Sequence, residues 1–130
     1  MATIRKEFVL KVDVAQVWDA LRDFGAVHVR LAPGFVLDTQ MDGDARVVTF
    51  ANGTVARETL VTIDDGDRRI VYTIRSNRLA HHNASAQVFE HGDGVCRFVW
   101  ITDVLPDDIA HYIDSQMDQG MAAMKGNFAG

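Results

Sequence analysis

The chain has 130 residues, a formal net charge of −5 at pH 7 and one cysteine. This length suits a single domain that buries its own core, so we expect one domain over residues 1–130. The acidic balance argues against a nucleic-acid partner, because a phosphate backbone would be repelled. A lone cysteine excludes an internal disulfide, and no apolar run reaches the roughly 18 residues of a membrane span. We therefore expect a cytoplasmic protein with no membrane insertion.

The N-terminal part of the chain predicts one strand followed by two short helices. Apolar and polar residues alternate over residues 4–12, which predicts a strand ending at Asp13. Asp13 and Gln16 have the spacing of a capping box, which predicts a helix over residues 14–21. A second, weaker helical segment is expected over residues 24–31, before a Pro-Gly turn.

Six further strands are expected in the middle of the chain, separated by short turns rich in Gly, Asp and Asn. They cover residues 35–41, 45–50, 54–63, 69–74, 84–90 and 95–104. Turns this short force antiparallel pairing of successive strands. A sheet with so many strands is strongly twisted, so we expect it to curl around a helix.

Residues 107–125 predict one long amphipathic helix. Its apolar stripe is Ile109, Ile113, Met117, Met121 and Met124. Tyr112, Gln116 and Gly120 form a row beside that stripe. Flexible thioethers next to a glycine and an amide fit the lining of an adaptable apolar cavity, and they fit an irregular solid core equally well.

Several short motifs resemble the START-related superfamily often called SRPBCC, which includes polyketide cyclases and dehydrases, pollen allergens and plant abscisic-acid receptors. The motifs are Val17-Trp18, Ala56-Arg57-Glu58-Thr59-Leu60 with Asp64-Asp65 after it, the 78–83 loop and Asp107-Asp108. The resemblance covers essentially the whole chain. It implies an α+β helix-grip fold, in which a curved seven-stranded antiparallel sheet holds the C-terminal helix over a hydrophobic cavity. It does not decide the chemistry, because this fold hosts binding proteins and enzymes alike.

Glu58 is the main candidate for chemistry. Resemblance to the receptor branch, in which this glutamate enters the pocket, places Glu58 on the concave face. A three-residue loop over 51–53, with its glycine left-handed, would pair Arg46 with Glu58. A two-residue turn would instead pair Arg46 with Thr59. We favour the first register because a buried carboxylate needs a partner, and the alternative is an exposed ion pair on the convex face.

Strand parity suggests further cavity residues. If the loop over 91–94 has four residues, Val99 lies on the face of Ala84 and Ala86, and Trp100 lies on the opposite face. A one-residue bulge would reverse this, so the face of Trp100 stays open. The predicted ligand-binding residues are Arg46, Val48, Glu58, Leu60, Tyr72, Ala84, Ala86, Val99, Tyr112, Gln116, Met117 and Gly120.

Most catalytic and metal-binding patterns are missing from the sequence. The five histidines lack metal-ligand spacing, so we expect no metal and no cofactor. Lysine occurs only near the chain ends, which leaves no buried amine for a Schiff base. Glu58 and His82 remain as candidates for proton transfer. Only one member of the His81-His82 pair could point inward from an extended segment, and a solvated loop histidine is the alternative.

Two functions follow from these residues. The first is binding of a hydrophobic small molecule, such as a lipid, polyketide or other ring compound, with Arg46 and Glu58 anchoring its polar end. The second is a polyketide cyclase or dehydrase that uses Glu58, with His82, for proton transfer. We favour binding, because the sequence offers one carboxylate and one histidine of open orientation. An assembly module with a vestigial pocket is a third interpretation, and the sequence leaves open a homodimer.

Overall fold

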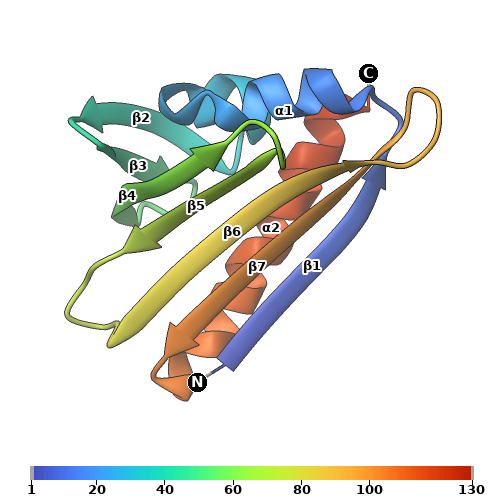
Figure 1. The fold of residues 1–130 in the computed structure, drawn as a ribbon. Coiled ribbons are helices and arrows are strands. Elements are labelled where there is room, and N and C mark those ends of the chain that lie inside the picture. The colour runs from blue at the N-terminus through green and yellow to red at the C-terminus, as the bar shows by residue number, and fades with distance from the viewer. Residues whose placement is uncertain (1, 130) are drawn as a thin grey trace.

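The computed structural model describes residues 2–129 and shows a curved sheet wrapped around one long helix (Figure 1). The strands are β1 (Ala2–Leu10), β2 (Val36–Asp42), β3 (Ala45–Phe50), β4 (Val55–Asp64), β5 (Arg69–Ile74), β6 (His81–Glu90) and β7 (Cys96–Leu105). Their order in the seven-stranded sheet is β1-β7-β6-β5-β4-β3-β2, and every neighbouring pair is antiparallel. The predicted α+β helix-grip fold is confirmed.

The helical segments lie at one end of the sheet and across its concave face. They are α1 (Val14–Arg22), the 3₁₀ turn η1 (Phe24–Ala26), the π-helical turn η2 (Val27–Leu31), the 3₁₀ turn η3 (Asp107–Ile109) and α2 (Ala110–Phe128). In Figure 1, α1 crosses one end of the molecule and α2 passes behind β6 and β7. The predicted C-terminal helix therefore opens with a 3₁₀ turn. Among residues 2–129, no helix combines the length and apolarity that spanning a membrane requires.

Element ends follow local side-chain chemistry, with small shifts from the predicted bounds. β1 ends at Leu10, two residues earlier than expected. Asp13 caps α1, and its carboxylate accepts a hydrogen bond from the backbone N of Ala15 at 3.3 Å. β6 begins at His81, three residues earlier than expected, because His81 already pairs with Leu105 of β7.

Two groups of contacts fix α2 on the sheet. Lys6 of β1 binds Asp114, and it binds Asp118 at 2.8 Å; these carboxylates lie one turn apart on α2. Phe8 of β1 stacks on Phe98 of β7 with ring centroids 4.9 Å apart, and Lys125 Nζ of α2 lies 5.6 Å from the centroid of the Phe8 ring. The C-terminal half of α2 therefore rests on close-packed side chains of the sheet.

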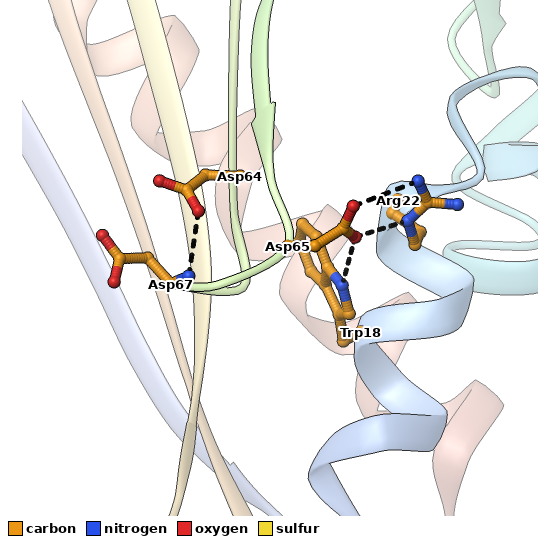
Figure 2. Close-up of polar contacts among 5 residues, drawn as sticks. All are labelled: Trp18, Arg22, Asp64, Asp65 and Asp67. Carbon is orange, nitrogen blue, oxygen red and sulfur yellow. Dashed lines mark hydrogen bonds and ion pairs between the residues drawn. The ribbon is translucent and has the colours of Figure 1, made fainter.

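A polar clip joins α1 to the β4–β5 turn (Figure 2). One oxygen of Asp65, Oδ1, accepts hydrogen bonds from Arg22 Nε at 2.8 Å and from Trp18 Nε1 at 3.0 Å. Arg22, and secondarily Trp18, lower the pKa of Asp65. Asp64 Oδ1 accepts from the backbone N of Asp67 at 3.0 Å and so shapes the same turn. Two of the motifs that carry the family resemblance, around Trp18 and Asp65, thus meet in one contact between α1 and the β4–β5 turn.

Candidate ligand-binding cavity

A cavity of about 300 Å³ lies between the concave face of the sheet and the N-terminal half of α2. Its wall is mainly apolar and comes from η2, from strands β2 to β7 and from α2. The volume is at the lower end of the roughly 300–1,000 Å³ typical of small-molecule sites. The cavity that the resemblance implies is therefore present, and it suits a compact ligand.

The β3–β4 turn sets which side chains enter this cavity. Phe50 N donates to Thr54 O at 2.8 Å, and Gly53 N donates to Phe50 O at 2.9 Å, which closes a three-residue loop. Gly53 has a φ of 87°, a left-handed conformation that glycine adopts without steric cost. Arg46 is therefore the register partner of Glu58, as predicted for a loop of this length.

Arg46 and Glu58 form a buried ion pair in the cavity wall. Arg46 Nε donates to Glu58 Oε1 at 2.7 Å, and Nη1 donates to the carbonyl oxygen of Phe24 at 3.1 Å. The guanidinium carbon lies 3.9 Å from the centroid of the Phe24 ring and 5.1 Å from that of Tyr72. Only 8% of the Arg46 side chain and 7% of the Glu58 side chain are exposed. The pair is therefore internal, and the alternative of an exposed pair on the convex face is wrong.

Tyr72 supplies a hydroxyl beside this pair. Its oxygen accepts a hydrogen bond from Trp100 Nε1 at 3.3 Å. Burial, and then the nearby Glu58 charge, raise the pKa of Tyr72 far above its ordinary value, so the hydroxyl keeps its proton at neutral pH. Among residues 2–129, that proton has no protein acceptor. Tyr72 can therefore donate a hydrogen bond to a molecule in the cavity.

His82 lies in β6 and lines the cavity, so it is not a solvated loop histidine. Its Nδ1 accepts a hydrogen bond from the backbone N of Ile74 at 3.1 Å, which assigns the ring proton to Nε2. Burial, with a smaller contribution from His81, lowers the pKa of His82 to about 4. At neutral pH His82 is thus a neutral donor through Nε2, and its only basic nitrogen is already engaged.

The mouth of the cavity lies between the β3–β4 turn, the β5–β6 turn and the first turns of α2. Asn52 Nδ2 donates to the Tyr112 hydroxyl at 3.2 Å, and Thr54 Oγ1 lies 3.4 Å from the same oxygen. The guanidinium carbon of Arg78 lies 6.0 Å from the centroid of the Tyr112 ring. Gln116 and the next residue of α2, Met117, continue the lining toward the interior.

The structure brings most of the predicted site residues to the cavity wall. These are Arg46, Val48, Glu58, Tyr72, Ala86, Tyr112, Gln116 and Met117, together with His82. Leu60 and Ala84 do not line it: Leu60 packs against the hydrophobic core, and Ala84 lies between its register partners Tyr72 and Thr102. The ligand-binding role of the lining residues stays a prediction.

The predicted place of Val99 is wrong. Glu90 pairs with Cys96, so the β6–β7 loop has five residues rather than four. Because side chains alternate with a period of two, one extra loop residue reverses the face of every residue in β7. Trp100 therefore pairs with Ala86 and lines the cavity, whereas Val99 lies on the opposite face.

The predicted gap at Gly120 is filled by aromatic side chains. A Cβ at Gly120 would lie 2.9 Å from two ring atoms of Trp100 and 3.1 Å from Cε2 of Phe35. These distances are shorter than van der Waals contact, so glycine allows the indole to reach the helix backbone. Gly120 is consequently absent from the cavity wall and serves close packing, whereas Tyr112 and Gln116 of the same row line the cavity.

Several cavity residues were missed from the sequence. Thr102 shares the face of Trp100, so the correct loop length would have found it. Phe35 was expected to begin a strand over 35–41, and in the structure it lies one residue before β2. Arg75 and Arg78 lie at the mouth; Arg78 opens the 78–83 loop that the resemblance had marked, whereas Arg75 had only its place beside the β5–β6 turn.

Comparisons with known proteins agree with this architecture. The sequence matches the model of a family described as "Polyketide cyclase / dehydrase and lipid transport" over residues 1–129. A comparison with curated protein sequences finds no significant match. A structure from Thermobifida fusca is 27% identical, with a TM-score of 0.80 over 99% of this chain and 91% of that chain.

Two more distant structures share the fold. A START superfamily protein from Mycobacterium smegmatis is 10% identical, with a TM-score of 0.78 over 98% of this chain and 97% of that chain. The di-domain ARO/CYC BexL from the BE-7585A biosynthetic pathway is 15% identical, with a TM-score of 0.81 over 98% of this chain and 46% of that chain. The chain therefore belongs to the polyketide cyclase / dehydrase and lipid transport family, and it shares the fold of the START superfamily protein.

Proposed function

We propose that this protein binds a small hydrophobic molecule, such as a lipid, polyketide or other ring compound, in the cavity beneath α2. The observation that carries the proposal is a mainly apolar cavity of about 300 Å³ with a few polar groups on its wall. An apolar body would be favoured there because it removes hydrocarbon surface from water.

Polar atoms without a hydrogen-bond partner lie at the inner end of the cavity, and they favour a ligand that carries one polar group there. Among residues 2–129, Glu58 Oε2, Arg46 Nη2 and the Tyr72 hydroxyl proton have no protein partner. A ligand hydroxyl or carbonyl group would complete these hydrogen bonds inside a site of low dielectric, where an unpaired polar atom is costly. The inner end of the cavity thus favours a neutral polar group.

A cyclase or dehydrase receives less support from the same geometry. Proton transfer at a substrate carbon needs a positioned base and a positioned acid. His82 has its basic nitrogen bonded to the backbone of Ile74, which leaves Glu58 Oε2 as the one free carboxylate or imidazole acceptor among the described lining residues. Turnover of a polyketone that Glu58→Gln abolishes, with ligand affinity kept, would establish the enzymatic alternative.

The binding proposal can be tested with an uncharged fluorescent probe. N-phenyl-1-naphthylamine is a compact apolar molecule whose emission rises in an apolar site. We expect saturable binding to the folded protein, measured by fluorescence titration. Ala86→Leu places a larger side chain in the cavity wall and should weaken that binding at least tenfold, which corresponds to about 1.4 kcal/mol.

Ser85→Leu is the matched control, because Ser85 precedes Ala86 on β6 and points to the other face. It should leave probe binding unchanged. Circular dichroism and a melting curve check that both variants are folded. Unchanged binding in folded Ala86→Leu would contradict the proposal, as would equal loss in both variants.

A further inference from the structure

The charges around the cavity are unevenly distributed. Four arginines line it, namely Arg46, Arg57, Arg75 and Arg78, and Glu58 is the only acidic residue in the lining. The chain as a whole carries a formal net charge of −5, so this excess of positive charge runs against the overall composition. The cavity is therefore a local positive region on an acidic protein.

Two of the four arginines are neutralised by carboxylates of the protein. Arg46 is paired with Glu58 inside the cavity, and Arg57 is paired with Asp42 on the neighbouring β2–β3 hairpin. Arg75 and Arg78 differ, because among residues 2–129 neither has a carboxylate within ion-pair distance. The unbalanced charge therefore lies at the mouth.

Local structure holds these two arginines at the rim. Arg75 directly follows the end of β5, where the backbone N of Ile74 is bonded to His82. Arg78 lies in a tight turn, in which its backbone N donates to Ser76 Oγ at 3.0 Å. The Arg78 guanidinium lies against the Tyr112 ring of α2. Both side chains line the cavity and are exposed to solvent, so they can meet a group that projects from it.

We infer that the ligand is an anionic amphiphile, whose apolar body fills the cavity and whose single carboxylate lies at the mouth between Arg75 and Arg78. Guanidinium groups bind carboxylates through paired hydrogen bonds, which suits them to this task. The inner end carries no net charge, because Arg46 and Glu58 neutralise each other, so the acid group is held at the mouth rather than inside. This inference rests on the proposed binding function and adds the ligand's charge and orientation.

The test compares molecules that differ only in the acidic group. Decanoate and decan-1-ol share the same chain, and each displaces bound N-phenyl-1-naphthylamine if it enters the cavity. We expect decanoate to compete about tenfold more strongly, the effect of partly solvated charge-assisted hydrogen bonds. High salt should reduce this preference by screening, without weakening the alcohol.

The variant Arg75→Gln/Arg78→Gln should remove the preference, bringing decanoate to the level of decan-1-ol when each competition is normalised to the probe affinity of the same variant. Arg68→Gln/Arg69→Gln is the matched control, since it removes the same charge at the opposite end of β5. That control should retain the preference for the acid.

The outcomes separate this inference from the proposed function. Probe binding with equal competition by acid and alcohol would overturn the inference and leave the binding function standing. No probe binding and no displacement by either compound would overturn both. Sedimentation with anionic phospholipid vesicles tests the other source of an acidic group. Vesicle binding that needs Arg75 and Arg78, together with no preference for free decanoate, would assign them to a lipid surface and overturn the inference.

Discussion

Two arginine–carboxylate pairs occupy opposite environments in this molecule. Arg46 and Glu58 meet at 2.7 Å on the concave face, with 8% and 7% of their side chains exposed. Arg22 and Asp65 meet at 2.8 Å at the end of the sheet, with 44% and 63% exposed, and Figure 2 shows that the indole of Trp18 shares the Asp65 carboxylate. The bond lengths are nearly equal, so distance alone does not distinguish the pairs.

Solvation separates their roles. Water replaces either partner of an exposed pair at small cost, so the Arg22–Asp65 pair mainly orients α1 against the β4–β5 turn. A buried charge that loses its partner has no such substitute. The inner pair is therefore sensitive to change, and among residues 2–129 its atoms Glu58 Oε2 and Arg46 Nη2 have no partner, which in the proposed function leaves them for a ligand. The same chemistry orients elements at the surface, and in the proposed function it serves recognition inside.

The largest expected effect is the loss of one partner of the inner pair. Arg46→Met or Glu58→Leu should each lower the free energy of unfolding by about 3–5 kcal/mol, because an uncompensated charge stays buried. The double variant should lose less than the sum of the two losses. Denaturant unfolding of all four proteins gives the coupling energy.

The same double-mutant cycle at Arg22 and Asp65 is the control and should show coupling close to zero. If one inner single variant does not fold, a folded double variant leads to the same conclusion. Coupling near zero at Arg46 and Glu58 would contradict the contrast between the two pairs.

A second effect concerns His82, a polar group buried without an ion-pair partner. Its pKa is lowered from 6.5 to about 4 in the fold, so between these values the unfolded chain binds more protons than the native state. The free energy of unfolding therefore falls by roughly 3 kcal/mol as the pH is lowered from 6.5 to 4, and above pH 6.5 this loss is absent.

His82→Asn should remove most of this loss of unfolding free energy at acid pH. The asparagine amide oxygen can still accept the Ile74 N–H, and the amide does not gain a proton in this range. His81→Asn, on the exposed neighbour, is the control and should retain the acid loss. Unfolding free energies measured from pH 7 to pH 4 check the prediction. An equal acid loss in His82→Asn would assign the effect to other groups.

The next effect tests how closely the Trp100 indole packs against α2 at Gly120. Gly120→Ala should destabilise the fold by about 1–3 kcal/mol, because the new Cβ would lie 2.9 Å from the indole. Gly126→Ala on the same helix meets no atom within 4 Å and should be neutral or stabilising by up to about 1 kcal/mol. Trp100→Phe shortens the ring and should rescue Gly120→Ala. Failure of that rescue would show that the indole is not the obstacle.

The smallest effect is expected at the outer pair. Arg22→Gln should lower the Tm by less than about 4 °C, because the pair is largely solvated. Binding of N-phenyl-1-naphthylamine should stay unchanged, since Arg22 lies outside the cavity wall. A melting curve and a probe titration on one sample measure both. A larger drop in Tm would mean that the Arg22–Asp65 contact contributes more to stability than an exposed pair should. A change in probe affinity would mean that this contact also affects the cavity.

Local patterns in the sequence predicted much of the fold and part of the site. Short Gly- and Asp-containing turns predicted antiparallel neighbours, and the apolar stripe predicted α2. At the loop over 51–53 the sequence allowed two registers, and the need of a buried Glu58 for a partner favoured the three-residue loop that the left-handed Gly53 closes.

Tertiary structure decided the rest. One extra residue in the β6–β7 loop turned Trp100 into the cavity and Val99 away from it, because a strand has a period of two and a single-residue error reverses every side chain. Trp100 then filled the space beside Gly120, which the sequence had suggested for a ligand. Such contacts join segments far apart along the chain, so no local pattern records them. Sequence alone therefore determined that α2 lies over a curved sheet, whereas close packing between distant side chains decided where the cavity remains.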